Sequence, residues 1–326
     1  MTRHCGRTIV QLLGLALCLA LAGPVHGQNA APGTAGITVA SHPLKDPIGC
    51  TDTFVAHDLP HTTTTADGTI RMYQANGAGL ATGDLDNDGD LDLVLGGEYG
   101  PNTLLWNEGD LGFRKTTFGS GPTRMLTLVD ADLDDYLDIV LTTNVGAVNY
   151  WHNQGDGTFQ REFLPGVAHP AYVLAWGDLD RDGDLDLVTG AYDAGFLTDR
   201  GTEYLLGAGS GVYVYENRNG AFASPTKLAS NAQALALAIL DLNRDDLPDL
   251  LVGNDFDVPD YAFVQTGAGL GPDGWAPADP FAVTTHSTMS LDMGDVDNDG
   301  EAEIFASDMK PIARDPATLA AWMPLM

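Results

Sequence analysis

Five short stretches of the sequence carry acidic residues at alternating positions, and each could hold a metal ion. The first is DLDNDGDLD, residues 84–92, and related stretches occupy residues 130–138, 178–186, 241–249 and 295–303. Consecutive stretches begin 46 to 63 residues apart, so the pattern is an internal repeat. Carboxylates this close together repel one another unless a cation lies among them. The chemistry that these stretches predict is therefore cation binding.

The order of residue types within each stretch predicts calcium as the cation. Calcium takes about six to eight oxygen ligands, and an EF-hand loop supplies them from positions 1, 3 and 5, the backbone carbonyl of position 7 and a distant glutamate. Glycine at position 6 makes the sharp turn, and here position 9 would replace the distant glutamate. The expected ligands, with position 7 contributing its carbonyl oxygen, are Asp84, Asp86, Asp88, Asp90 and Asp92; Asp130, Asp132, Asp134, Tyr136 and Asp138; Asp178, Asp180, Asp182, Asp184 and Asp186; Asp241, Asn243, Asp245, Leu247 and Asp249; and Asp295, Asp297, Asp299, Glu301 and Glu303.

The five loops are not equally suited to calcium, although up to five ions are expected. The first, third and fifth loops have glycine at position 6, whereas the second and fourth have Asp135 and Asp246, and aspartate only tolerates a left-handed conformation. Asn243 also removes one charge from the fourth loop, and Glu303 brings a longer side chain to position 9 of the fifth. We expect the first and third loops to bind most tightly. A solvated surface loop is the alternative for any single copy, but five copies in one register disfavour it.

These ions are expected to be structural rather than catalytic. A largely saturated all-oxygen site leaves no open position at which a water molecule could be activated. Each loop also lies where it can hold two strands together, because apolar or small residues lead into it, as in GLATG, and a short apolar run such as LVLGG or IVLTT follows it. Each acidic loop is thus expected to join the two strands of a hairpin.

The segments that follow the hairpins predict the rest of the fold. In three units, LLWNEGDLGF, YWHNQGDGTF and VYVYENRNGAF each indicate a third strand, a turn and an aromatic residue that opens a fourth strand. Four strands in a repeat of about 50 residues, with no helical stretch between them, predict an all-β β-propeller with four-stranded antiparallel blades. A solenoid of β-hairpins is the alternative architecture.

The chain is expected to have three parts. Residues 1–27 predict a signal peptide, because two arginines precede an apolar run of about 16 residues and a cleavage site is expected after Gly27. A membrane anchor is the alternative, although a span needs about 20 residues. Residues 28–78 are expected to form an N-terminal segment with one or two strands, and residues 79–326 hold the propeller repeats.

Composition agrees with a secreted, periplasmic or extracellular protein without membrane insertion after signal cleavage. Cys5 and Cys18 would leave with the signal peptide, so Cys50 would have no partner for an intramolecular disulfide. Calcium could then supply the stabilisation that disulfides cannot. The formal net charge of −30 disfavours binding to nucleic acid and to anionic lipid, and it attracts cations.

Other motifs give no catalytic constellation. Residues 269–274, GLGPDG, match G-x-G-x-x-G, but no βαβ unit surrounds them, and a turn-rich loop is expected instead. His57, His61 and His169 fall near the expected blade ends, where surface histidines are the simpler interpretation.

The loops of the form D-x-[DN]-x-D-[GD]-x-x-[DE], with the NQGDGTF type of turn, resemble the FG-GAP/VCBS repeats of the integrin α-subunit propeller and its bacterial relatives. The resemblance extends from about Gly79 to Asp308. THSTMSLDMGDVDNDG and FASDM further resemble the secreted bacterial propellers that often carry an ASPIC/UnbV domain. The family implies a calcium-stabilised propeller, commonly seven-bladed, that acts outside the cell in adhesion or ligand binding. Some relatives are lectins, and in others the fold supports a lyase or phospholipase site.

About five blades are recognisable, and the chain departs from the family pattern after IFASDMK. Third and fourth strands are expected there, but DPATLAAWMPLM indicates a helix. Two explanations stay open: an incomplete seven-bladed propeller, or a five-bladed ring closed by N-terminal strands near GITVA and DTFVAHDLP.

The expected function is that of an exported binding or adhesion module for a glycan or protein ligand. The alternative is a polysaccharide-acting enzyme, a lyase or hydrolase, with its site on the propeller face. The insertion YDAGFLTDRGTEYLLGAGSG, residues 192–211, could carry either function or be structural, because long loops on a rigid scaffold commonly carry sites.

Overall fold

The computed structural model describes residues 56–63, 65, 68, 77–143, 146–192, 211–255, 258–281, 284, 287–299 and 302–309. Within these ranges the chain forms strands β1–β18 and one short 3-10 helix, η3, and no α-helix. None of the helical segments described is long and apolar enough to cross a membrane. The predicted signal peptide, the third-blade insertion between 193 and 210 and the predicted C-terminal helix lie outside the described residues.

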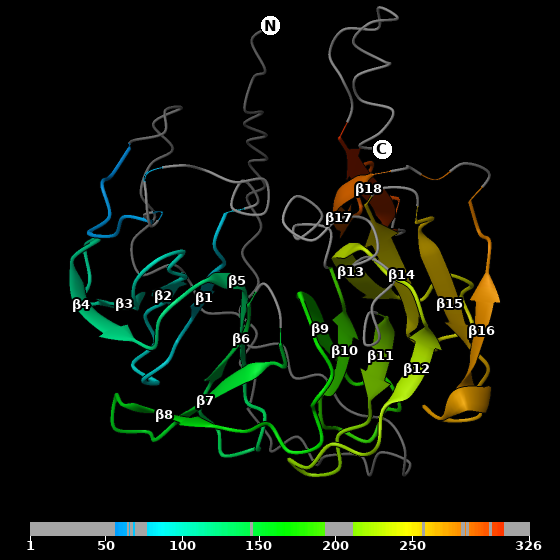
Figure 1. Cartoon of the computed structure of the whole chain (residues 1–326), viewed down its shortest axis with the longest axis horizontal. Helices are drawn as coiled ribbons and strands as arrows, with labels where there is room; N and C mark the ends of the chain where they lie inside the picture. Colours follow the sequence, from blue (N-terminus) through cyan, green and yellow to red (C-terminus); the bar gives the residue numbers. More distant parts are fainter. Residues whose placement is uncertain are drawn as a thin grey trace, which may run out of the picture. The chain divides into compact units, whose positions relative to one another are not determined.

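Each of the first four acidic repeats forms one four-stranded antiparallel sheet, a blade, whose strands pair in chain order (Figure 1). Blade 1 contains β1 (Leu80–Gly83), β2 (Asp92–Leu95), β3 (Asn102–Asn107) and β4 (Phe113–Phe118). Blade 2 contains β5 (Thr123–Val129), β6 (Asp138–Thr143), β7 (Asn149–Asn153) and β8 (Phe159–Glu162). Blade 3 contains β9 (Val173–Gly177), β10 (Asp186–Gly190), β11 (Val212–Tyr215) and β12 (Thr226–Ala229). Blade 4 contains β13 (Ala234–Leu240), β14 (Asp249–Asn254), β15 (Tyr261–Gln265) and β16 (Trp275–Ala278).

The fifth repeat contributes a two-stranded sheet, β17 (Thr288–Gly294) and β18 (Glu303–Asp308). The expected hairpin around each acidic loop is therefore present in all five repeats, with antiparallel pairing on its two sides. Trp106 lies on a third strand, as do Trp151 and Tyr215. These positions confirm the predicted placement of the turns and of the third strands.

Blade 4 also has the third and fourth strands that the sequence pattern did not identify. Its turn is longer than those of blades 1 and 2 and includes η3 (Pro272–Gly274) between β15 and β16. A Cβ atom at Gly274 would lie 1.6 Å from the carbonyl oxygen of Gly269, so the tight turn requires glycine there. The GLGPDG stretch is thus a turn-rich loop, as expected.

The second strands of blades 2, 3 and 4 are buried on both faces, which explains their nearly unbroken apolar sequences, whereas β2 of blade 1 alternates between buried and half-buried residues. Ile139 and Val140 on β6 point to opposite faces of the sheet, and both are fully buried. Leu187 and Val188 on β10 behave in the same way. Strands buried on both sides lose the alternation of apolar and polar residues that marks a half-exposed strand.

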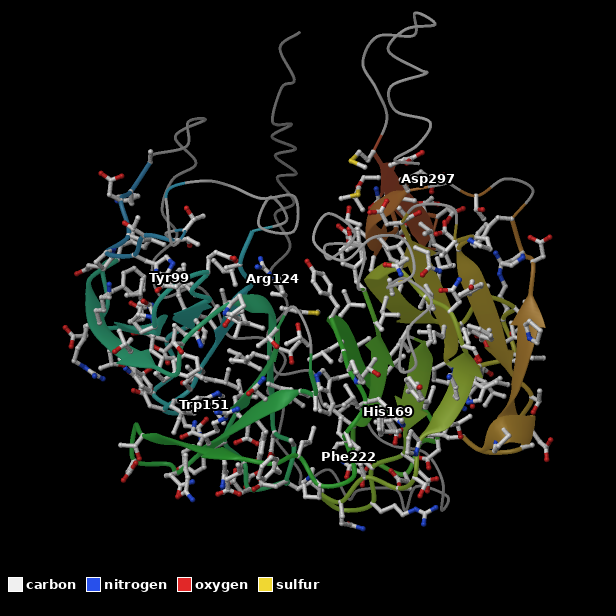
Figure 2. All side chains as sticks on the ribbon, viewed as in Figure 1. Tyr99, Arg124, Trp151, His169, Phe222 and Asp297 are labelled. Carbon is white, nitrogen blue, oxygen red and sulfur yellow. The ribbon has the colours of Figure 1, made fainter. Side chains whose placement is uncertain are left out.

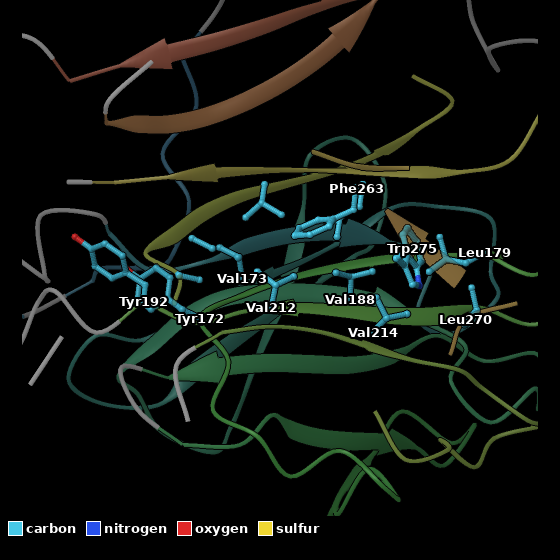
Figure 3. Packing of buried hydrophobic residues seen from close by; sticks show 14 residues of the cluster. Tyr172, Val173, Leu179, Val188, Tyr192, Val212, Val214, Phe263, Leu270 and Trp275 are labelled. Atoms are coloured by element: carbon cyan, nitrogen blue, oxygen red, sulfur yellow. The ribbon is translucent and has the colours of Figure 1, made fainter. Parts of the chain in front are cut away.

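The cores lie between neighbouring blades. Val173, Val188 and Val212 of blade 3 pack in one cluster with Val252 and Phe263 of blade 4 (Figure 3). Similar clusters join blade 1 to blade 2, blade 2 to blade 3, and blade 4 to the β17–β18 pair. Each blade therefore buries its faces against its neighbours rather than within itself.

The first strands of consecutive repeats lie against one another. β1 contacts β5, β5 contacts β9, β9 contacts β13, and β13 contacts β17. Sheets arranged in this way around their first strands form a β-propeller. The predicted all-β fold with four-stranded antiparallel blades is confirmed.

Candidate metal centres

Each acidic loop begins after the first strand of its sheet and ends on the first residue of the second strand. In blade 1, Gly83 pairs with Asp92 at the base of the loop. The last acidic residue of every loop occupies the same place, and these residues are Asp92, Asp138, Asp186, Asp249 and Glu303. The hairpin therefore presents nine residues as one tight turn at the end of the sheet.

In the four complete blades the position-9 carboxylate is buried and holds the loop against the segment of the third strand. Asp186 Oδ2 accepts a hydrogen bond from the backbone N–H of Leu179 at 2.8 Å, and its Oδ1 accepts one from Asn217 at 2.8 Å. The equivalent pair of bonds occurs in blades 1, 2 and 4. In the fifth repeat Glu303 Oε2 accepts from Val296 at 2.8 Å. Each oxygen of Asp92, Asp186 and Asp249 keeps a second lone pair that a cation could use, whereas Asp138 Oδ2 also accepts a bond from the Tyr150 hydroxyl at 2.9 Å.

Carboxylates at positions 1 and 5 shape the turn itself. Asp84 accepts backbone N–H bonds from Asp88 at 3.0 Å and from Gly89 at 2.9 Å. Asp88 in turn accepts the N–H of Asp90 at 2.9 Å. The second and fourth loops repeat this arrangement. These bonds fold the loop so that its side-chain oxygens face inward.

The side chains at positions 1, 3 and 9 come together in the first three loops. One oxygen from each of Asp84, Asp86 and Asp92 lies within 4.8 Å of the other two, and the second and third loops form the same group from Asp130, Asp132 and Asp138 and from Asp178, Asp180 and Asp186. In the fifth repeat the group is Asp295, Asp297 and Asp299, and Figure 2 labels Asp297. Such all-oxygen groups fit calcium, which prefers hard oxygen ligands.

The remaining predicted ligands are not brought into these groups. In the first and third loops the position-5 residues, Asp88 and Asp182, stand outside the converging set. In the fourth loop the Asn243 side-chain amide donates to Asp245 Oδ2 at 2.9 Å. Glu301 lies outside the described residues. Coordination by position 5 and by the position-7 carbonyl, including those of Tyr136 and Leu247, stays a prediction.

Burial makes the inward carboxylates hard to ionise when no cation is bound. Burial raises the pKa of Asp186 to about 7 and that of Asp138 to about 6. Both side chains are completely buried. A divalent cation beside them would favour the charged form and lower these pKa values. The electrostatics of the loops therefore fit a bound cation.

Left-handed backbone occurs at two places in the loops. At position 6, φ is 92° for Gly89, 72° for Asp135 and 68° for Asp246, so aspartate does adopt the conformation expected there. Position 4 is also left-handed in every loop, with φ of 59° at Asn87 and 64° at Leu133. The sequence pattern treated position 4 as variable and gave no sign of this constraint.

In each complete blade an amide side chain at the end of the third strand bonds the acidic loop, and it was not identified from the sequence. Asn153 Nδ2 donates to the carbonyl of Leu137 in its own loop at 3.1 Å, and Gln265 Nε2 donates to Pro248 at 2.6 Å. Asn107 and Asn217 make the same bond. The signal was visible, because asparagine follows the aromatic or charged residue in WN, HN and EN of the three aligned turns.

The histidines near the blade ends make local contacts rather than a catalytic arrangement. His61 Nδ1 lies 3.0 Å from Thr103 Oγ1. The His169 ring stacks on Tyr213, with ring centroids 4.1 Å apart, and His169 is labelled in Figure 2. Both contacts agree with the surface role expected for these residues.

Comparison with known proteins places the repeats in a family. A family model described as FG-GAP-like repeat matches residues 84–141, 130–189 and 241–306, which together make up more than half of the chain. Integrin alpha-7 of Rattus norvegicus is 39% identical over 106 residues, covering 31% of this chain and 9% of that protein. Integrin alpha-7 of Homo sapiens is also 39% identical over 106 residues, covering 31% of this chain and 8% of that protein. The matched stretch thus spans less than a tenth of either integrin subunit.

A solved structure also aligns with part of this chain. The crystal structure of BBS1N in complex with ARL6DN, soaked with lead, contains a chain that aligns with a TM-score of 0.37 and 15% identity. The alignment covers 67% of this chain and 70% of that chain.

Proposed function

This chain belongs to the FG-GAP-like repeat family, and we propose that it is an exported, calcium-stabilised propeller that acts as a binding or adhesion module. The observation that carries the proposal is the repeated convergence of carboxylates at the loop ends of neighbouring blades. Similarity to integrin alpha-7 supports an adhesion module exposed outside the cell. We propose a glycan or a protein as the ligand. Nucleic acid is disfavoured as a ligand, because the chain has a net charge of −30.

Calcium would be held by side chains at positions 1, 3, 5 and 9 of each loop, with one backbone carbonyl. When bound, the ion supplies the positive charge that these crowded carboxylates lack. The chain's own contribution is to place the carboxylates, because the backbone N–H bonds to Asp84 and Asp186 preform the turn and fix it to the third strand. Up to five ions are proposed, one for each loop.

Export rests on the predicted signal peptide. N-terminal sequencing of protein recovered outside the cytoplasm should begin at Gln28. A mature chain that still contains residues 1–27 would contradict cleavage after Gly27 and would favour the membrane anchor.

The binding function is tested with the full mature chain. Immobilised glycans and extracellular matrix proteins would be screened in 1 mM calcium and again after chelation. We expect a specific ligand to bind in calcium, to be released by chelation and to bind again when calcium is restored. Binding that is equal in both conditions would contradict the role of calcium. Turnover of a polysaccharide would favour the alternative enzyme, which no observation on the described residues supports over a binding module.

A further inference from the structure

The second acidic loop has a histidine beside it at a place where the other complete blades carry different residues. This place is the residue immediately before the amide side chain that bonds the loop, and the four residues that occupy it are Trp106, His152, Glu216, which follows β11, and Val264. His152 lies on β7, next to Trp151, which Figure 2 labels. Its Nε2 atom is 3.1 Å from Asp132 Oδ2 and 3.5 Å from Asp134 Oδ2.

The same place in blade 3 carries Glu216, whose carboxylate pairs with the Arg218 guanidinium at 2.7 Å. In blade 2 the side chain at this place is an imidazole, which is a nitrogen ligand.

Imidazole changes which cation the second loop would favour. Calcium is bound by oxygen, whereas imidazole nitrogen suits zinc, copper, iron and nickel. His152, Asp132 and Asp134 offer one ligand atom each, and these atoms all lie within 4.8 Å of one another. In a tetrahedral zinc site with bonds of about 2.0–2.2 Å, neighbouring ligand atoms are about 3.3–3.6 Å apart. The distances from His152 Nε2 to Asp132 Oδ2 and Asp134 Oδ2, 3.1 and 3.5 Å, lie close to that spacing.

The other ring nitrogen has a carboxylate near it, at a distance longer than a hydrogen bond. His152 Nδ1 lies 3.6 Å from Glu162 Oε1 on β8. Histidine ligands commonly have a carboxylate or carbonyl beside the nitrogen that does not touch the metal, and this partner sets the tautomer and orientation of the ring. The ring is further held parallel to Tyr150, with an interplanar angle of 10° and ring centroids 6.1 Å apart. Tyr150 itself donates to Asp138 Oδ2 at 2.9 Å.

We propose that the second loop binds a transition-metal cation of the zinc class through His152 Nε2, Asp132 and Asp134, with Glu162 as the positioning residue for the imidazole ring. Asp132 also belongs to the oxygen group with Asp130 and Asp138. One carboxylate cannot serve both arrangements fully, so zinc and calcium compete at this loop. The proposal goes beyond calcium stabilisation, which the other four loops would retain.

The test uses the full mature chain without an affinity tag, in 5 mM calcium. Zinc is titrated by calorimetry, and cobalt is used as a spectroscopic probe of nitrogen ligation. We expect one zinc equivalent that His152→Ala removes and that Glu162→Gln weakens about tenfold. Glu216→Ala, the matched change in blade 3, should leave zinc binding unchanged. Unfolding of each variant in calcium shows that the fold is retained.

A second readout keeps the test independent of the alanine variant. In wild-type protein labelled with 15N-histidine, the Nε2 resonance of His152 should shift when one equivalent of zinc is added. Unchanged zinc affinity in His152→Ala would overturn the proposal. A second result would also overturn it: the wild-type chain binds no zinc, and His152→Ala gains a calcium ion at the second loop. The imidazole would then act only as a positive charge that neutralises Asp132 and Asp134.

Discussion

The side-chain amide of Asn153 donates a hydrogen bond at 2.8 Å to the backbone carbonyl oxygen of Leu85, which belongs to the acidic loop of the preceding blade. Because the same amide also bonds Leu137 in its own loop, it links two candidate cation sites. Gln265 repeats the link between blades 3 and 4, bonding Leu179 at 2.9 Å and Pro248 at 2.6 Å. The third strands of blades 2 and 4 thus link the loop of their own blade to the loop of the preceding blade.

Asn153→Ala should lower the free energy of unfolding by about 1–3 kcal/mol, because it leaves the buried carbonyl of Leu85 without its donor. Asn107→Ala is the matched control, since the Asn107 amide bonds only the exposed carbonyl of Leu91 among the described residues. Urea unfolding of both variants measures the difference. Equal losses would mean that the bond between blades adds nothing.

Removing calcium should lower the melting temperature. A ligand that binds only the native state stabilises it by RT ln(1 + [L]/Kd), so a site with Kd of about 10⁻⁴–10⁻³ M gains about 0.4–1.4 kcal/mol in 1 mM calcium. Thermal unfolding of the mature chain in calcium and in chelator measures the effect. Equal melting temperatures would contradict structural calcium.

Loss of a ligand should cost more at the loops expected to bind tightly. In 1 mM calcium, Asp88→Ala and Asp182→Ala should lower the melting temperature more than Asp134→Ala and Asp245→Ala do, because the first and third loops have four aspartate ligands and the turn glycine. The four variants should differ much less in chelator. The reverse order in calcium would refute the ranking of the loops but not calcium binding itself.

Without metal, stability should fall as the pH rises from 5 to 8. Burial raises the pKa of Asp138 to about 6 and that of Asp186 to about 7, from an ordinary value of 3.8. Between the unfolded pKa of 3.8 and the raised native pKa of each group, the native state binds more protons than the unfolded state. The stability that this proton binding contributes is lost as the pH rises and the two groups ionise. Melting temperatures in chelator at both pH values measure the slope, and calcium or Asp186→Asn should reduce it. A melting temperature that rises with pH in chelator would contradict this.

Leu133→Asn should stabilise the protein by about 1 kcal/mol, because Leu133 has a φ of 64° and leucine is strained in the left-handed region that asparagine tolerates. Its side chain is 48% exposed, so little apolar burial is lost. Leu91→Asn is the control, because Leu91 is an exposed leucine at position 8 of the first loop and is not left-handed. Equal effects in urea unfolding would mean that backbone strain is not the cause.

The sequence by itself determined the repeat, the hairpins and the acidic turns. These features are local: the carboxylates of one loop lie within nine residues, and the apolar runs beside them show which segments are buried. The same locality let Gly89, Asp135 and Asp246 indicate the left-handed turn at position 6, which the backbone confirms. The third and fourth strands of blade 4 escaped detection because a turn with a 3-10 segment replaces the Asn- and Gly-containing turn that the other three blades share.

Only the tertiary structure decided which groups from other strands reach a loop. Asn153 and Leu85 are 68 residues apart, and Gln265 and Leu179 are 86 residues apart, yet each pair is hydrogen-bonded. His152 reaches Asp132 in the same way, from a neighbouring strand rather than from the loop. Such contacts depend on how strands pair and how blades pack, and the period of the sequence repeat does not show which distant residues come into contact. The ligand pattern within each loop is therefore legible in the sequence, but the environment that selects its cation is set by the packing of the blades.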